Sequence, residues 1–141
     1  MSAAHSWRHR LPPAAQRCAG ERGSASMQVV ILLPLLFSIM FLGLQAALFY
    51  HARTVAIAAA QEGARAAGSE TGSAEEGIAA AAAFIAAAGG ADVIEGASVS
   101  GSRSAATATV TVRGTSLSVL PGWSPRVTQS ATMPVERLTT G

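Results

Sequence analysis

One stretch of sequence decides the fold of this chain: residues 27–50 read MQVVILLPLLFSIMFLGLQAALFY. Fourteen of these 24 residues are Leu, Ile, Val or Phe, and no charged residue occurs between Gly23 and Tyr50. As a helix, 24 residues extend about 36 Å, which exceeds the roughly 30 Å hydrocarbon core of a bilayer. The apolar side chains favour insertion more than the few polar ones oppose it. We therefore predict a single transmembrane helix over residues 23–50.

Two alternatives to a membrane span stay open at the level of sequence. A signal peptide has an apolar region of about 7–15 residues, shorter than this one, but the small residues Ala46, Ala47 and Ala52 suit a signal peptidase. Cleavage there would give a secreted product that begins after about Ala52. A core helix of a soluble protein would need covering, and the rest of the chain has few large apolar residues for that purpose.

The arginines predict the orientation of the chain in the membrane. Residues 1–22 carry four arginines and one glutamate, a net charge of +3, whereas residues 51–141 carry six arginines and seven acids, a net charge of −1. Positive residues close to a membrane helix stay in the cytoplasm. We expect a cell-membrane protein with a basic cytoplasmic tail over 1–22 and its C-terminal part outside. The basic pI of about 9.5 then reflects topology, and no nucleic-acid partner is expected.

Beyond the membrane the pattern predicts an α+β fold. The alanine-dense residues 51–68 continue the transmembrane helix as an exposed extension, and 69–141 form a small extracytoplasmic domain. A second helix is predicted over 74–88, because Ser73 and Glu76 have the spacing of a capping box and two glycines follow.

The remaining residues predict an antiparallel sheet of three or four strands. Residues 105–113 alternate Ala/Val with Thr/Arg, as a half-buried strand does, and 93–100 precede them as the other arm of a hairpin. Residues 115–120 are a possible short strand that ends at Pro-Gly. A last strand places alternate residues of 127–135 on one face.

Small residues recur along the first helix at a spacing of four, which predicts a face that another helix can approach closely. This stripe consists of Gly43, Ala47, Ala52, Ala56, Ala60 and Ala64. A second row beside it contains Ala59, Gly63 and Ala67. An alanine-rich composition also produces such rows by chance.

The chain offers little for catalysis. Its only cysteine, Cys18, precedes the apolar run, and no lysine occurs at all. Only one histidine, His51, lies beyond the membrane segment, so the usual nucleophile–base pairs and metal-ligand clusters have little to draw on. We expect no enzyme activity, no metal and no cofactor.

Two motifs resemble a known family. Arg22–Gln28 reads RGSASMQ directly before the apolar run, and Ala58–Ala67 reads AAAQEGARAA. Together they resemble the TadE-like family, the pseudopilins and minor pilins of the tight-adherence (Flp pilus) system. The resemblance implies cleavage by a prepilin peptidase between Gly23 and Ser24, and it identifies Glu62, Gly63 and Arg65 as the second motif. Gln28 stands where the family usually has a glutamate, and Gln61 stands where it usually has an arginine.

The leading hypothesis is therefore a structural or assembly component of a Tad-type pilus or secretion apparatus, acting through lateral helix packing. Its partners would be the bilayer, other pilin-like subunits or Tad assembly proteins, and a prepilin peptidase. The alternative is a membrane-tethered binding or adhesin module that does not polymerise. The threonine face of residues 107–113 would then be the ligand surface.

Overall fold

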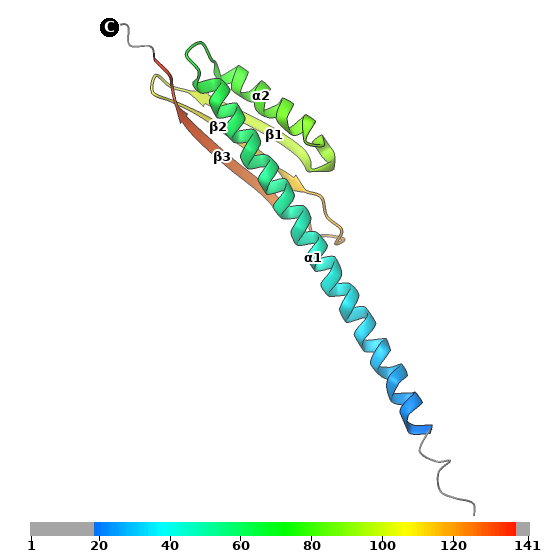
Figure 1. Ribbon diagram of the computed structural model, residues 1–141. Helices are drawn as coiled ribbons and strands as arrows, with labels where there is room; N and C mark the ends of the chain where they lie inside the picture. Colours follow the sequence, from blue (N-terminus) through cyan, green and yellow to red (C-terminus); the bar gives the residue numbers. More distant parts are fainter. Residues whose placement is uncertain (1–18, 138–141) are drawn as a thin grey trace, which may run out of the picture. The chain divides into compact units, whose positions relative to one another are not determined.

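The computed structural model describes residues 19–137, with side chains from Met27 onward. The elements follow one another as α1 (Ala19–Gly68), α2 (Ala74–Ala87), the 3₁₀ turn η2 (Gly90–Asp92), β1 (Ile94–Arg103), β2 (Thr107–Ser116) and β3 (Arg126–Pro134) (Figure 1). The predicted α+β class, with a long apolar helix, a second helix and an antiparallel sheet, is confirmed. Cys18 and most of the predicted tail lie outside the described residues.

Helix α1 contributes to two units of the chain, Met1–Ile39 and Met40–Gly141. It is a single α-helix of 50 residues, so no break separates the predicted membrane segment from its extension. It begins at Ala19, four residues before the predicted start. Within the first unit, Pro34 lies inside the helix, and the Ser38 hydroxyl donates to the Pro34 carbonyl at 2.8 Å. This bond satisfies the Ser38 hydroxyl without water.

Helix α2 forms where its sequence signals predict it. The Ser73 hydroxyl accepts a hydrogen bond from the Glu76 backbone N–H at 3.1 Å, and the Glu76 carboxylate accepts one from the Ser73 N–H at 2.9 Å. This reciprocal capping box satisfies two backbone donors that the helix itself leaves unpaired. The helix ends at Ala87, and Gly89 and Gly90 follow with positive φ angles of 119° and 58°. Glycine adopts this conformation without the penalty that a side chain would bring.

The sheet is antiparallel with the order β1-β2-β3. As predicted, Ala108, Val110 and Val112 share one face of β2 and are fully buried. The possible strand over 115–120 is wrong: Thr115 and Ser116 end β2, and residues 117–125 form a loop. The sheet therefore has three strands. The loop does not pair as a strand because its backbone groups bond to α1, as shown below.

The core of the second unit lies between the two helices and the inner face of the sheet. Val110 contacts both helices, since a Cβ added to Gly63 or to Gly77 would lie 3.0 or 3.2 Å from its methyl groups. Most of the buried residues on α1 are alanines. The larger buried side chains include Ile85 of α2, Ile94 of β1 and Val127 of β3. Alanine buries little area, so this core depends on close approach rather than on large side chains.

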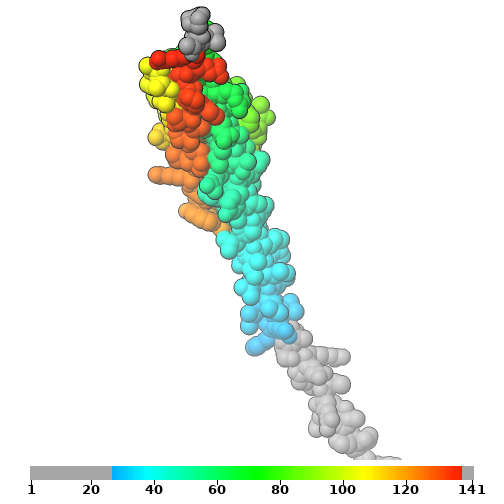
Figure 2. All heavy atoms as spheres, turned by 60° about the vertical axis from the view of Figure 1, so that its left-hand side comes forward, coloured from blue at the N-terminus to red at the C-terminus, as the bar shows by residue number. Residues whose placement is uncertain are grey.

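The last strand lies beside the end of α1, and Figure 2 shows β3 (orange to red) next to this part of the helix (green). The Glu136 N–H donates to the Gly68 carbonyl at 2.9 Å. A Cβ on Gly68 would lie 3.0 Å from the Pro134 carbonyl oxygen. The last described residues thus close against the C-terminus of the first helix.

Candidate functional site

The first half of α1 exposes a continuous apolar surface. Met27, Val30 and Ile31 are 74%, 70% and 69% exposed, and the large side chains from Leu32 to Leu44 are exposed as well. The helix is long and apolar enough to cross a membrane, and its most apolar window has no buried residue. A surface of this kind is costly in water and favourable in lipid. The predicted membrane helix is therefore a candidate span, consistent with membrane localisation.

The residues of the predicted processing site lie at the beginning of α1. Gly23 and Ser24 are both within the helix, and Gln28 is exposed one turn further on. An exposed carboxamide can donate and accept hydrogen bonds, but it carries no charge that could neutralise a neighbouring ammonium group. The geometry of the described residues brings no other predicted site residue next to them.

Gln45 lies on α1 near the start of the second unit, and it is only 1% exposed. Its Nε2 donates to the Leu117 carbonyl at 3.2 Å, while its Oε1 accepts from the Val119 N–H at 2.9 Å and from the Ser118 hydroxyl at 3.1 Å. One side chain thus holds three consecutive residues of the loop after β2. From sequence it was only a polar residue inside an apolar run, because nothing in the run reveals a partner more than 70 residues away.

The predicted stripe of small residues divides into two parts in the structure. Ala52, Ala56, Ala60 and Ala64 are fully buried in the core of their own chain, so they are unavailable to a second chain. The stripe as drawn from sequence needs this correction because the step from Ala47 to Ala52 is five residues, or about 140° around the helix. Gly43 and Ala47 lie on a different face from the other four and are exposed.

The helix that approaches the small residues most closely is α2 of the same chain. A Cβ on Gly63 would lie 2.6 Å from the Gly77 carbonyl oxygen, and a Cβ on Gly77 would lie 2.7 Å from the Gly63 carbonyl oxygen. Each glycine therefore makes room for the other's backbone. Of the three residues in the second motif, Gly63 serves packing, whereas Glu62 and Arg65 form an exposed ion pair at 2.6 Å. Such a pair contributes little stability in water.

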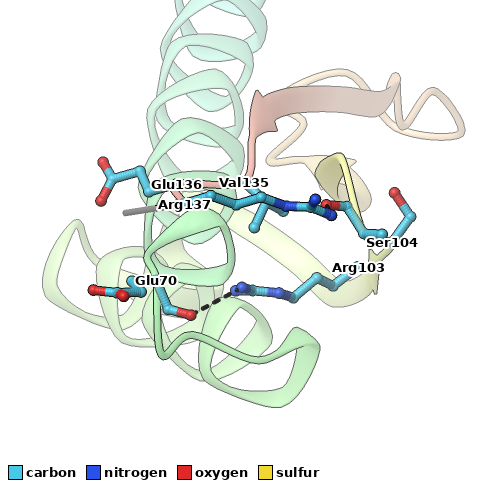
Figure 3. Close-up of a pocket in the computed structure, with 7 residues that line it drawn as sticks. Glu70, Arg103, Ser104, Val135, Glu136 and Arg137 are labelled. Atoms are coloured by element: carbon cyan, nitrogen blue, oxygen red, sulfur yellow. Dashed lines mark hydrogen bonds between the residues drawn. The ribbon is translucent and has the colours of Figure 1, made fainter. Parts of the chain in front are cut away.

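The end of α1 is capped by an arginine from the sheet (Figure 3). The Arg103 guanidinium donates to the backbone carbonyls of Ala67, Ser69 and Glu70, the last two at 2.8 and 3.2 Å. Helix C-termini leave carbonyls unpaired and carry a partial negative charge, so a cation there is favourable. An open hollow surrounds Arg103 and is lined also by Glu136 and Arg137. Because Arg103 is occupied in capping the helix, its role in this hollow is structural.

The outer face of the sheet carries the threonines that the alternative hypothesis requires. Thr109 and Thr132 share a hydrogen bond of 2.9 Å across the strands, and Thr111 and Ser130 share another of 2.9 Å. These hydroxyls therefore satisfy one another in cross-strand pairs. Among residues 19–137, no three His, Cys, Asp or Glu side chains gather as a metal site would require.

These observations define the class of protein: a small α+β domain built on the continuation of a helix that can span a membrane. A family model described as TadE-like protein matches residues 23–65, which confirms the resemblance to the TadE-like family over this segment. The match begins at Gly23, runs through the apolar part of α1 and ends at Arg65 of the second motif. Comparison with curated proteins and with solved structures gave no match.

Proposed function

We propose that this chain is a pilin-like subunit, a pseudopilin or minor pilin, that α1 holds in the cell membrane and that assembles with other subunits of a Tad-type pilus or secretion apparatus. Its N-terminus lies in the cytoplasm and its C-terminal domain outside. Its role is structural and involves no catalysis. The bilayer, other pilin-like subunits or assembly proteins, and a prepilin peptidase are its partners.

The observation that supports this proposal best is the single helix α1. Its exposed apolar half has the properties of a membrane segment, and its second half is the central element of a folded domain. The family match covers 23–65 and so includes both halves. A subunit that assembles laterally in a membrane needs an accessible helix surface and a folded domain attached to it.

The accessible surface for lateral packing is the face of α1 that carries Gly43 and Ala47. These residues are four apart, so they share one side of the helix, and a Cβ placed on Gly43 would meet no atom within 4 Å apart from its own turns of helix backbone. Gln45 is about 200° from each of them and faces the domain's own loop. Small residues at this spacing let a second helix backbone approach closely inside a bilayer.

Disulfide crosslinking in native membranes tests this assembly. Gly43→Cys and Ala47→Cys, each in a Cys18→Ser background, should give disulfide-linked dimers under mild oxidation, because a neighbouring subunit packs against this face. Phe41→Cys is the matched control one turn away, because it lies about 160° from Gly43 and 120° from Ala47 around the helix and is exposed. Monomers alone at all three positions would contradict assembly and favour the membrane-tethered binding module.

Processing is a separate part of the proposal. Mass spectrometry of the membrane-extracted protein, produced together with the cognate peptidase, should show a chain that begins at Ser24. A Gly23→Leu variant, which removes the small residue before the cut, should keep its full mass. An intact N-terminus in the parent protein would defeat processing and leave the assembly proposal standing.

Protease treatment of intact cells tests the orientation. We expect residues beyond Tyr50 to be accessible from outside and, in the uncleaved Gly23→Leu variant, the arginine-bearing end to be protected. Removal of the N-terminal tail by external protease would reverse the assignment.

A further inference from the structure

The loop between β2 and β3, residues 117–125, is an ordered structure. The Ser116 N–H donates to the Pro125 carbonyl at 3.0 Å and closes its base. Pro121 and Gly122 occupy the centre of a turn in which the Trp123 N–H faces the Leu120 carbonyl at 3.3 Å, and Gly122 has a φ of 80°. Proline followed by glycine with positive φ is typical of a type II turn.

Hydrogen bonds to Gln45 fix this loop against α1. With the Gln45 contacts described above, the Leu117 carbonyl and the Val119 N–H both have partners. The Ser118 hydroxyl also accepts from the Leu120 N–H at 3.2 Å. Each backbone group that is paired in this way lowers the cost of placing the loop against a less aqueous surface.

The surface of the loop is uncharged and includes large exposed apolar side chains. Trp123 is 50% exposed and Val119 is 37% exposed, although both are large apolar residues. No charged residue occurs between Arg113 and Arg126, which flank the loop and are both exposed. An open, mostly apolar groove runs between the loop and α1, with Leu42, Phe49 and Trp123 among its walls.

The length of α1 places this loop at the edge of the bilayer. If the hydrocarbon core begins at Ser24, the first residue after Gly23, about 20 helical residues cross 30 Å and reach Gly43. The next residues up to Tyr50 are still uncharged, and they lie level with the interfacial layer of headgroups. The loop is bonded to Gln45 and packs beside residues 42–50, so it has the same depth.

We propose that the loop 117–125 is a second membrane contact, in which Trp123 lies at the boundary of headgroups and acyl chains and the groove beside α1 receives lipid. Trp and Tyr concentrate at this boundary because their rings are apolar at one end and polar at the other. The exposed Tyr50 lies on α1 at the same level. This contact fixes the height of the domain above the bilayer, and it rests on α1 spanning the membrane.

Fluorescence quenching in vesicles tests this contact. The full chain with Trp7→Phe keeps Trp123 as its only tryptophan, and it is reconstituted into phosphatidylcholine–phosphatidylglycerol vesicles. Lipids brominated near the top of the acyl chain should lower its emission about twofold, as expected of an indole at the interface. Iodide in the water should quench it less than it quenches free tryptophan.

Two relocated tryptophans make the result decisive, each in a Trp7→Phe, Trp123→Phe background. Ala106→Trp is exposed in the turn at the opposite end of β2, about 30 Å along the strand, and should be quenched by iodide alone. Leu36→Trp lies in the candidate span and should be quenched by bromine near the chain ends.

If Leu36→Trp is quenched by lipid and Trp123 is not, α1 spans the membrane but the loop contact is refuted. The loop contact is refuted too if Trp123 is shielded from iodide without any lipid quenching, because a protein partner would then cover it. If neither is quenched by lipid, the membrane span itself fails.

Discussion

Replacing Gly63 with alanine tests the closest approach between the two helices of the domain. The added Cβ would lie 2.6 Å from the Gly77 carbonyl oxygen and 3.0 Å from both the Ala81 Cβ and a Val110 methyl group. Real Cβ atoms do not approach backbone oxygens this closely, and neither backbone can rotate away as a side-chain end could. The helices must therefore separate by several tenths of an ångström.

The magnitude of the effect follows from two opposing terms. Overpacking a filled core costs about 1–3 kcal/mol, and a clash with backbone belongs at the upper end of that range. Alanine favours the helix over glycine by about 1 kcal/mol, which offsets part of the cost. We expect a net loss of about 2 kcal/mol in the free energy of unfolding, which is close to a 30-fold change in the opening equilibrium.

Hydrogen exchange by mass spectrometry measures this change in the membrane-bound protein. Peptides from β2, which contain the buried Val110 and Val112, should exchange about 30-fold faster in Gly63→Ala where exchange follows the opening equilibrium. Gly43→Ala is the matched control on the same helix, because no atom lies within 4 Å of its Cβ. We expect no change in β2 exchange for this control.

A double substitution sharpens the test. Gly77→Ala brings its Cβ within 2.7 Å of the Gly63 carbonyl oxygen, so the same separation of the helices relieves both clashes. The double variant should cost less than the sum of the single variants, as coupled neighbours do. Exchange in Gly63→Ala at the parent rate or slower would refute the close helix crossing.

Five further substitutions, at four positions, test single contacts by the same exchange measurement. Arg103→Ala removes three hydrogen bonds at the end of α1 and should cost about 2 kcal/mol, whereas Arg103→Lys keeps the charge and should cost about 1 kcal/mol. Ser73→Ala removes the cap of α2 and should cost about 1 kcal/mol. Gln45→Leu deprives the Val119 N–H of its acceptor, so exchange at that amide should rise while β2 stays protected. Ser116→Ala removes the one buried side-chain hydroxyl without a partner among the described residues, and should leave stability equal or up to about 1 kcal/mol higher.

The contrary results are equally specific. Equal costs for Arg103→Ala and Arg103→Lys would mean that the fork of donors, and not the charge, caps the helix. Unchanged exchange in α2 would reject the capping role of Ser73. Global loosening in Gln45→Leu would show that the loop belongs to the cooperative core, and destabilisation by Ser116→Ala would reveal a partner for its hydroxyl.

Local signals in the sequence were sufficient wherever neighbours in sequence are also neighbours in space. The capping box at Ser73 and Glu76 is such a case, since both bonds span three residues. The alternation of residues 105–113 identifies a strand with one buried face for the same reason. The apolar run likewise predicts a membrane helix by itself, because its length and lack of charge depend on no partner.

Features that depend on distant partners could not be predicted. Residues 117–120 (LSVL) resemble a strand by composition, yet their backbone bonds go to Gln45. The alanines of α1 indicated a closely approached face, but nothing in their spacing could say that this chain's own sheet and second helix would occupy it. Arg103 gave no signal as a helix cap, since the carbonyls it serves lie more than 30 residues earlier.

The bond between the Glu136 N–H and the Gly68 carbonyl has a consequence for biogenesis. The helix that forms the core is the first part of the domain to be synthesised, and the strand that covers its end is the last. During synthesis the end of α1 therefore stays uncovered until residues 126–136 have been made. This interval exposes the emerging polypeptide to proteases and to premature association. A chain truncated before Arg126 would lack β3, so the end of α1 would stay uncovered. C-terminal shortening should therefore lower the amount of the protein in the cell, while the fraction that inserts into the membrane changes less.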